Sequence, residues 1–170
     1  EIDVRLVGSE MCIRDRTRLF TRHKKSEKEC KMTNTEISDA MMKAFNEADW
    51  DTWRSFMAPD VTMQDFASGD FIEGVDAVMG YVMGWKSSFS NMIGTLENRI
   101  ESGNTLVEEC SWTGTNDGEL PMPDGSKIPP TGKSITIKNV LIFEMENGKC
   151  KSAKNYRDAM SMGAQLGLMG

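Results

Sequence analysis

The second half of this chain contains four long segments with the residue alternation of β-strands. They cover residues 91–101, 105–115, 134–146 and 149–158. Ser102-Gly103-Asn104 and Asn147-Gly148 separate neighbouring segments, and an Asn-Gly pair between alternating runs is typical of a tight hairpin turn. Four such strands in succession predict an antiparallel meander, so the fold must be built around a β-sheet.

Helical periodicity precedes these strands. Apolar residues recur at helical spacing across residues 33–47, and we expect either Asn34 or Thr35 to cap this helix. A second, short helix is expected over residues 49–57, capped by its first residue and ended by the Ala-Pro-Asp segment that follows.

A strand pair and a third helix connect these helices to the meander. Residues 61–66 alternate like a half-buried strand, and residues 71–73 form a short return strand after a turn. The third helix is expected over residues 75–88, and the apolar tail 159–169 is expected to be helical. Helices followed by a strand meander predict an α+β fold.

Length and charge restrict the class of protein. The chain has 170 residues, 39% of them apolar, which suits one domain with one core. Residues 1–31 carry nine Lys/Arg and six Asp/Glu, whereas residues 32–170 carry eleven and twenty. Phosphate and anionic lipid repel an acidic domain, so we expect no nucleic acid and no membrane as partner. No apolar run approaches the roughly 18 residues of a membrane span.

The N-terminal segment does not share the pattern of the rest. Residues 1–16 resemble translated sequencing-adapter text, and residues 17–31 are basic with few apolar side chains. We expect residues 1–31 to be a non-native or disordered extension, Met32 to be the initiator, and residues 32–170 to form the domain. A genuine basic tail is the alternative. The front lacks the apolar core of a signal peptide, and we expect a cytoplasmic protein.

Few residues suit metal or nucleotide chemistry. The one histidine, His23, and two of the four cysteines lie in the N-terminal segment 1–31, which we expect to be non-native or disordered. Cys110 and Cys150 remain, and neither belongs to a Cys-x-x-Cys pair. Glycine-rich phosphate-binding motifs do not occur in the sequence. We therefore expect no metal site and no cofactor.

Short motifs along the domain match one family when they are taken in order. They lie at residues 45–50, 58–61, 72–74, 112–118, 128–133, 147–149, 156–158 and 165–168. Their order and spacing resemble the SnoaL-like polyketide cyclases and ester cyclases of the nuclear transport factor 2-like superfamily. The resemblance implies a cone-shaped α+β fold, in which N-terminal helices pack in a curved, mostly antiparallel sheet that encloses a pocket. It also implies a homodimer and a small hydrophobic ligand.

The resemblance further implies an acid–base aspartate in the last strand. Tyr156-Arg157-Asp158 matches the family's Tyr-x-Asp segment, so Asp158 is the expected proton carrier in an intramolecular aldol ring closure. A carboxylate on the wall of a dry pocket has a raised pKa and can take a proton next to a carbonyl. The alternative is that Asp158 only caps the helix that follows.

Two other polar residues are candidates for the chemistry. The family often has Gly-Thr-His-Thr-Gly where this chain has Gly-Thr-Asn-Asp-Gly, so Asn116 stands at the usual histidine. Asn116 can donate a hydrogen bond to an enolate oxygen, or it can simply shape a turn. Asp65 shares a strand face with Val61 and Met63, where a buried carboxylate is costly. It is either a second acid–base group or the end of a frayed strand.

Four aromatic residues are the expected substrate contacts. Tyr156 shares strand parity with Asp158, so its hydroxyl is expected to reach a ligand oxygen. Trp85, Trp112 and Tyr81 are expected in the pocket wall. For each of them, packing in the core is the alternative.

Three functions are compatible with these residues. The first is a cofactor-free enzyme that abstracts a proton next to a carbonyl and so cyclises or isomerises a small hydrophobic carbonyl compound. The second is a non-catalytic binding or interaction module, because one fold hosts many functions. The third is an epoxide or ester hydrolase that positions water with pocket carboxylates. The family resemblance favours the first.

Overall fold

The computed structural model describes residues 32–122 and 125–169, so the expectations for residues 1–31 lie outside the described part of the chain. Its helices are α1 (Asn34–Glu47), α2 (Trp50–Ser55), α3 (Val75–Ser88) and α4 (Ala159–Leu166). The long strands are β1 (Met57–Asp65), β3 (Ile93–Ser102), β4 (Thr105–Thr115), β7 (Ser134–Glu146) and β8 (Lys149–Arg157). The short strands are β2 (Phe71–Glu73), β5 (Leu120–Pro121) and β6 (Lys127–Ile128).

A capping box starts helix α1. The hydroxyl of Thr33 accepts a hydrogen bond from the backbone N–H of Glu36, and the Glu36 carboxylate accepts one from the backbone N–H of Thr33. The expectation that Asn34 or Thr35 caps this helix was therefore wrong by one or two residues. Ala48 ends the helix in the left-handed conformation, with φ of 56°.

The start of β1 differs from its prediction. Asp49 caps α2 as expected, but α2 ends at Ser55, and Met57 already belongs to the strand. Pro59 is tolerated there because the pairing of β1 with β8 is irregular between Met57 and Thr62. A proline has no N–H to donate to a sheet, and an irregular stretch does not require one.

The predicted meander is confirmed. Strands β3, β4, β7 and β8 pair antiparallel in sequence order, and β4 and β7 have the predicted bounds. Asn147 and Gly148 both have positive φ, as the two-residue hairpin turn between β7 and β8 requires. The segment 116–133, expected to be a loop, contains the small β5–β6 pair.

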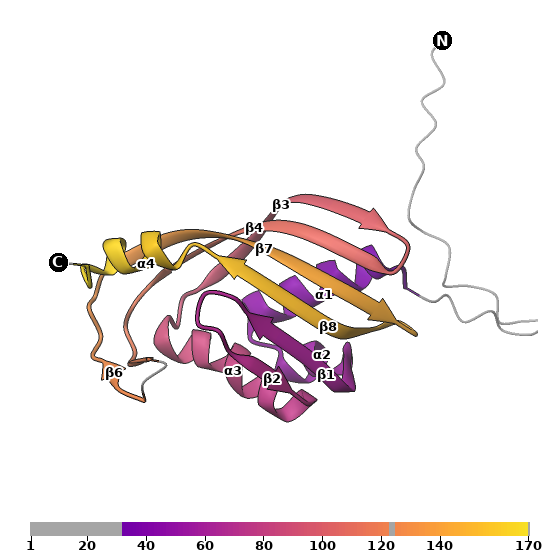
Figure 1. Ribbon diagram of the computed structural model, residues 1–170, viewed down its shortest axis with the longest axis horizontal. Coiled ribbons are helices and arrows are strands. Elements are labelled where there is room, and N and C mark those ends of the chain that lie inside the picture. The colour runs from indigo at the N-terminus through magenta and orange to yellow at the C-terminus, as the bar shows by residue number, and fades with distance from the viewer. Residues whose placement is uncertain (1–31, 123–124, 170) are drawn as a thin grey trace, which may run out of the picture. The chain divides into compact units, whose positions relative to one another are not determined.

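One pairing joins the two ends of the domain. The main sheet has the order β2-β1-β8-β7-β4-β3, and β1 runs parallel to β8 while every other pair is antiparallel (Figure 1). The first strand is thus held against the last. The result is the predicted α+β architecture, with a curved, mostly antiparallel sheet.

The helices and one face of the sheet enclose the core. Residues at alternate positions of β1 are buried, so Val61, Met63 and Asp65 share the inner face as predicted. Phe89 and Leu106 are among the residues that have no exposed surface. The inner face therefore carries both the apolar core and a buried carboxylate.

Candidate functional site

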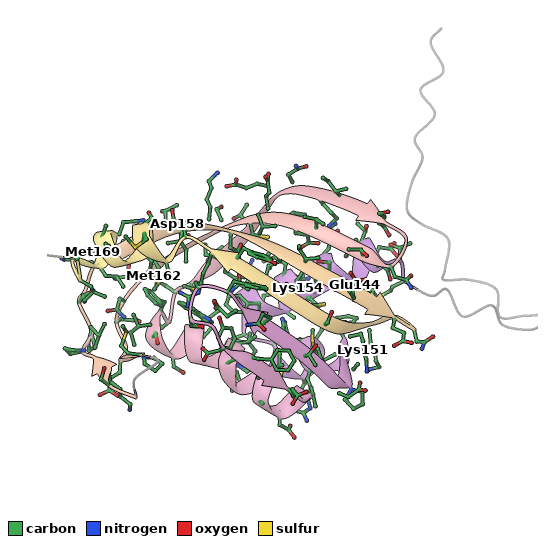
Figure 2. All side chains as sticks on the ribbon, viewed as in Figure 1. Glu144, Lys151, Lys154, Asp158, Met162 and Met169 are labelled. Atoms are coloured by element: carbon green, nitrogen blue, oxygen red, sulfur yellow. The ribbon has the colours of Figure 1, made fainter. Side chains whose placement is uncertain are left out.

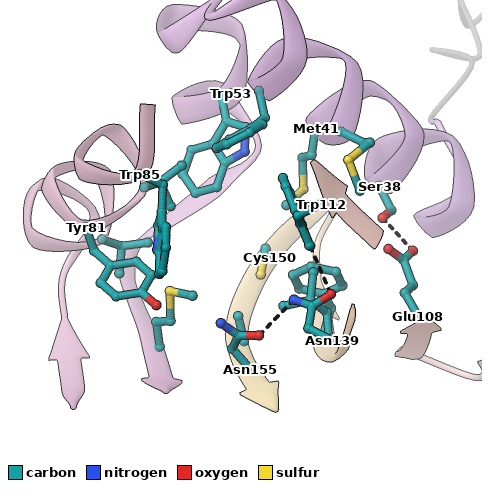
Figure 3. Close-up of a pocket in the computed structure, with 18 of the residues that line it drawn as sticks. Ser38, Met41, Trp53, Tyr81, Trp85, Glu108, Trp112, Asn139, Cys150 and Asn155 are labelled. Atoms are coloured by element: carbon teal, nitrogen blue, oxygen red, sulfur yellow. Dashed lines mark hydrogen bonds between the residues drawn. The ribbon is translucent and has the colours of Figure 1, made fainter. Parts of the chain in front are cut away.

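A cavity of about 120 Å³ lies between the helices and the inner face of the sheet. Figure 3 shows helix residues such as Met41, Trp53 and Trp85 on one side and sheet residues such as Trp112 and Asn139 on the other. Most of the lining is apolar. A dry cavity of about 150 Å³ can hold a benzene ring, so this one suits a small apolar ligand.

A carboxylate is the centre of the polar contacts behind one end of this cavity. Asp65 is fully buried, and its Oδ2 accepts hydrogen bonds from the Tyr81 hydroxyl and, at 2.9 Å, from Nε of Arg157. The amide of Asn155 lies 3.4 Å from the same oxygen. Oδ1 accepts two backbone N–H groups, those of Ala67 at 2.8 Å and the following residue at 3.2 Å. Both carboxylate oxygens are therefore fully engaged.

These contacts set the charges at this end. Burial alone would raise the pKa of Asp65, but the hydrogen bond from Tyr81 and the charge of Arg157 outweigh it and hold the pKa below its ordinary value. Burial and the neighbouring carboxylate raise the pKa of Tyr81 to about 12. At neutral pH, Asp65 is ionised and Tyr81 is protonated, and Asp65 is a weak base.

Arg157 brings a positive charge to the cavity wall. Its Nε is paired with Asp65, and its guanidinium carbon lies 5.0 Å from the centre of the Trp85 ring. Its side chain is only 12% exposed. No residue in the described ranges accepts a hydrogen bond from the two terminal nitrogens of this guanidinium. These nitrogens can therefore donate to an oxygen of a bound ligand.

The side-chain amides of Asn139 and Asn155 extend these polar contacts along the sheet (Figure 3). Nδ2 of Asn139 donates to Oδ1 of Asn155 over 2.8 Å, and the Trp112 indole N–H donates to Oδ1 of Asn139 over 2.9 Å. This chain fixes the orientation of both amides. It also fixes the Trp112 ring, which packs edge-on against Phe45 with 4.9 Å between ring centres.

The structure brings three of the predicted substrate contacts together. Tyr81, Trp85 and Trp112 all line the cavity. Tyr156 lies instead on the outer face of β8, where it stacks on Phe66 with 4.3 Å between ring centres.

Asp158 is also away from this cavity. It lies at the start of α4 (Figure 2), where its side chain accepts a hydrogen bond from the backbone N–H of Ser161 at 2.9 Å and caps the helix. It lines a separate hollow on the outer face with Tyr156. Tyr156 and Asp158 share strand parity as predicted, but that parity points out of the sheet, and Asn155 and Arg157 point inward.

Asn116 holds a loop together. It is fully buried, and its amide donates to the backbone oxygens of Ser88 and Gly118. Its Oδ1 accepts hydrogen bonds from the N–H and the hydroxyl of Thr131. It is not among the described residues that line the cavity, and its hydrogen-bonding groups are occupied.

The polar residues of the cavity wall were missed by the sequence analysis. Asn139, Asn155, Arg157 and Glu108 are polar residues at inward positions of β4, β7 and β8. The signal that could have found them is the one that identified Asp65, which is a polar residue at a strand position of apolar parity.

The two cysteines of the described domain, Cys110 and Cys150, are free and buried. Cys150 lines the cavity and Cys110 is buried; burial is the main cause that raises the pKa of each thiol to about 12, so both stay protonated and unreactive near neutral pH. Within residues 32–122 and 125–169, no three His, Cys, Asp or Glu side chains are grouped as a metal site. None of the described helices has the length and apolarity to cross a membrane.

Comparisons with known proteins agree with the sequence resemblance. A protein from Jannaschia sp. CCS1, assigned as a SnoaL-like polyketide cyclase, has a TM-score of 0.69 at 20% identity, over 78% of this chain and 90% of that one. IdmH of Streptomyces antibioticus, assigned as a polyketide cyclase, has 0.67 at 23% identity, over 80% and 99%. A Catenulispora acidiphila protein with a ketosteroid isomerase-like fold, in complex with trimethylamine, has 0.65 at 18% identity, over 79% and 95%. At these identities, the likeness shows the fold.

Sequence comparison gives the family itself. Among curated protein sequences, none matches this chain. The family model for SnoaL-like polyketide cyclases matches residues 35–166, which is nearly all of the described domain. The chain therefore belongs to the SnoaL-like polyketide cyclase family.

Proposed function

We propose that this protein is a cofactor-free enzyme that removes a proton next to a carbonyl group of a small hydrophobic compound, leading to cyclisation or isomerisation. The observation that carries the proposal is Arg157. It is a guanidinium in the wall of a largely apolar cavity, and its terminal nitrogens donate to no described residue. The assigned cyclase activity of the Jannaschia protein and of IdmH supports the same chemistry here.

The chemistry follows from the charge of Arg157. Removal of a proton next to a carbonyl leaves negative charge on the carbonyl oxygen, which becomes an enolate. A fixed cation in a water-poor cavity stabilises this charge far more than it would in water. Asp65 and the Trp85 ring hold the guanidinium in place before the ligand arrives, so little reorganisation is needed. Asp158, which caps α4, does not line this cavity, so the proposal does not depend on it.

The proposal is tested with 4-nitrophenol, whose phenolate is a planar, single-ring analogue of an enolate and is visible by its absorption. The native protein should bind it and favour the phenolate form. Arg157→Met should weaken phenolate binding by about 10- to 100-fold, the value of a charge-assisted hydrogen bond. Lys154→Met is the matched control, because Lys154 is exposed on the outer face of the same strand.

Arg157→Met also leaves Asp65 buried without its counter-ion, so a second measurement on the native protein is needed. The side-chain guanidinium resonances of Arg157 should shift in nitrogen-15 NMR when 4-nitrophenol is added. Equal phenolate binding by native protein and a folded Arg157→Met variant, or unshifted guanidinium resonances at saturation, would contradict the proposal.

A non-catalytic binding module is the second candidate. The observation that favours it is the state of Asp65, whose oxygens are fully engaged and whose pKa is low, so this carboxylate is a poor proton acceptor. The binding module and the enzyme are distinguished by exchange of the methyl protons of acetophenone for deuterium, which proton NMR measures. A binding module would bind 4-nitrophenol without accelerating this exchange.

Two expectations stay predictions, namely the homodimer that the family resemblance implies and the cytoplasmic location expected from the sequence. Phe66 and Tyr156 support the first, because they form an exposed aromatic stack on the outer face of the sheet. A second copy of the chain would cover this apolar surface.

A further inference from the structure

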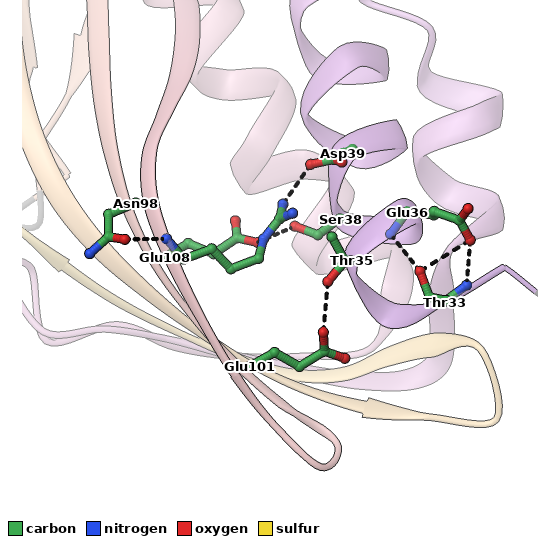
Figure 4. Close-up of polar contacts among 9 residues, drawn as sticks. Thr33, Thr35, Glu36, Ser38, Asp39, Asn98, Glu101 and Glu108 are labelled. Carbon is green, nitrogen blue, oxygen red and sulfur yellow. Dashed lines mark hydrogen bonds and ion pairs between the residues drawn. The ribbon is translucent and has the colours of Figure 1, made fainter. Parts of the chain in front are cut away.

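A second buried carboxylate, Glu108, lines the cavity itself, at the end away from Tyr81 (Figure 3). Glu108 comes from the middle of β4, and only 1% of its surface is exposed. Its Oε1 accepts hydrogen bonds from the Ser38 hydroxyl at 2.6 Å and from Nε of Arg99 at 2.7 Å (Figure 4). Helix α1 and strand β3 thus hold this side chain from two directions.

The second carboxylate oxygen of Glu108, Oε2, has no such hydrogen-bond partner among the described residues. Buried carboxylates usually have both oxygens satisfied, as Asp65 does, because an unpaired buried charge is costly. An oxygen left free on a cavity wall can accept a proton from a bound ligand.

Glu108 shares its cation with a second carboxylate. Arg99 pairs with Glu108 through Nε and with Asp39 through a terminal nitrogen at 2.7 Å, and its side chain is 13% exposed. One cation is therefore shared by two carboxylates. At the other end, Arg157 pairs with Asp65 through Nε alone, and its guanidinium reaches the cavity, whereas Asp65 does not line it.

Strand register places the two ends relative to each other. Asp65 pairs with Asn155, Asn155 with Leu141, and Leu141 with Glu108, so one continuous row crosses the sheet. Arg157 is two residues from Asn155 along β8, on the same face. Strands are about 4.8 Å apart and residues about 3.3 Å apart along a strand, so two strand spacings and the two-residue step put the backbones of Glu108 and Arg157 about 12 Å apart. Side chains reaching into the cavity from both positions leave room for a small ketone between them.

We propose that Glu108 is the base that takes the proton next to the ligand's carbonyl. This assignment rests on the proposed function and adds a second catalytic residue to Arg157. Oε2 of Glu108 forms a bond to the proton next to the ligand's carbonyl. The electron pair of the broken C–H bond forms the enolate, whose oxygen accepts hydrogen bonds from Arg157. In a ring closure, the enolate carbon attacks a second carbonyl of the same molecule. The new alkoxide then takes the proton back from Glu108, which returns to its carboxylate form.

The test is deuterium exchange of the acetophenone methyl protons, measured by proton NMR in heavy water. Glu108→Gln keeps the size of the side chain and an oxygen for Ser38 and Arg99, but it cannot take the proton. We expect the protein-dependent exchange rate to fall at least about 100-fold, the lower range for loss of a general base. Binding of 4-nitrophenol should change far less than in Arg157→Met.

Glu109→Gln is the matched control, because Glu109 is the next residue of β4 and is exposed on the outer face. It should exchange acetophenone at the native rate. Glu108→Asp, which keeps a carboxylate, should retain more exchange than Glu108→Gln if both are folded.

The outcomes separate the two proposals. Native exchange by a folded Glu108→Gln variant, together with loss in Arg157→Met, would overturn the role of Glu108 and leave the proposed function standing. If the native protein binds 4-nitrophenol but does not accelerate exchange, the enzyme proposal is contradicted, and the base assignment with it.

Discussion

Replacement of Asp65 by Asn should lower the free energy of unfolding by about 3–5 kcal/mol, the usual cost of removing one partner from a buried ion pair. The carboxylate accepts hydrogen bonds from five groups, and Arg157 has it as a buried counter-ion. An amide has one oxygen, and its NH₂ group would face donors instead of accepting from them. Urea unfolding at neutral pH measures this effect. Asp70→Asn, at an exposed position of the following turn, should have little effect.

The pH dependence of stability identifies the charge as the cause. The pKa of Asp65 is lower in the folded protein than its ordinary value, so its contribution is fully present above about pH 4. The contribution is lost as the pH falls through the folded-state pKa. The difference in stability between the native protein and Asp65→Asn should therefore shrink toward pH 2. A difference that stays constant down to that pH would show that the carboxylate charge is not responsible.

Replacement of Asn116 by Ala should cost about 3 kcal/mol of stability and loosen the segment 116–133. The backbone oxygens of Ser88 and Gly118 and the N–H of Thr131 would each lose their side-chain partner. A buried polar group left unpaired costs about 1–3 kcal/mol, and some of these groups have other contacts. Urea unfolding gives the stability, and faster amide hydrogen exchange at Thr131 reports the loop.

Asn104→Ala, in the exposed turn between β3 and β4, is the control for loss of an asparagine side chain. The sequence analysis considered Asn116 as an oxyanion donor, and the same variant tests that role. Native stability combined with loss of acetophenone exchange would support the oxyanion role and contradict the structural one.

Local rules predicted most of the elements. The capped helices, the Asn147-Gly148 turn and the alternation in β4 and β7 depend on neighbouring residues, and the structure has them. The start of β1 was misplaced because its first residues are strand only through long-range pairing with β8. That parallel pairing joins segments about ninety residues apart, and no local pattern encodes it.

The site was predicted less well, for a related reason. Alternation shows that Tyr156 and Asp158 share one face of β8 and that Asn155 and Arg157 share the other, but it does not show which face is inside. The pairing of β8 with β1 and β7 decides this. Glu108 lay within reach of sequence reasoning, since it shares a strand face with the apolar residues Leu106 and Cys110, as Asp65 does with Met63.

The central claim is that the cavity binds a carbonyl compound with its oxygen on Arg157. A crystal structure of the native protein with 4-nitrophenol tests it most directly. The account predicts the ring in the cavity between the helices and the sheet, with the phenolate oxygen about 2.7–3.2 Å from a terminal nitrogen of Arg157. A ligand bound instead on the outer face beside Tyr156 and Asp158, or one in the cavity with its oxygen turned away from Arg157, would contradict it.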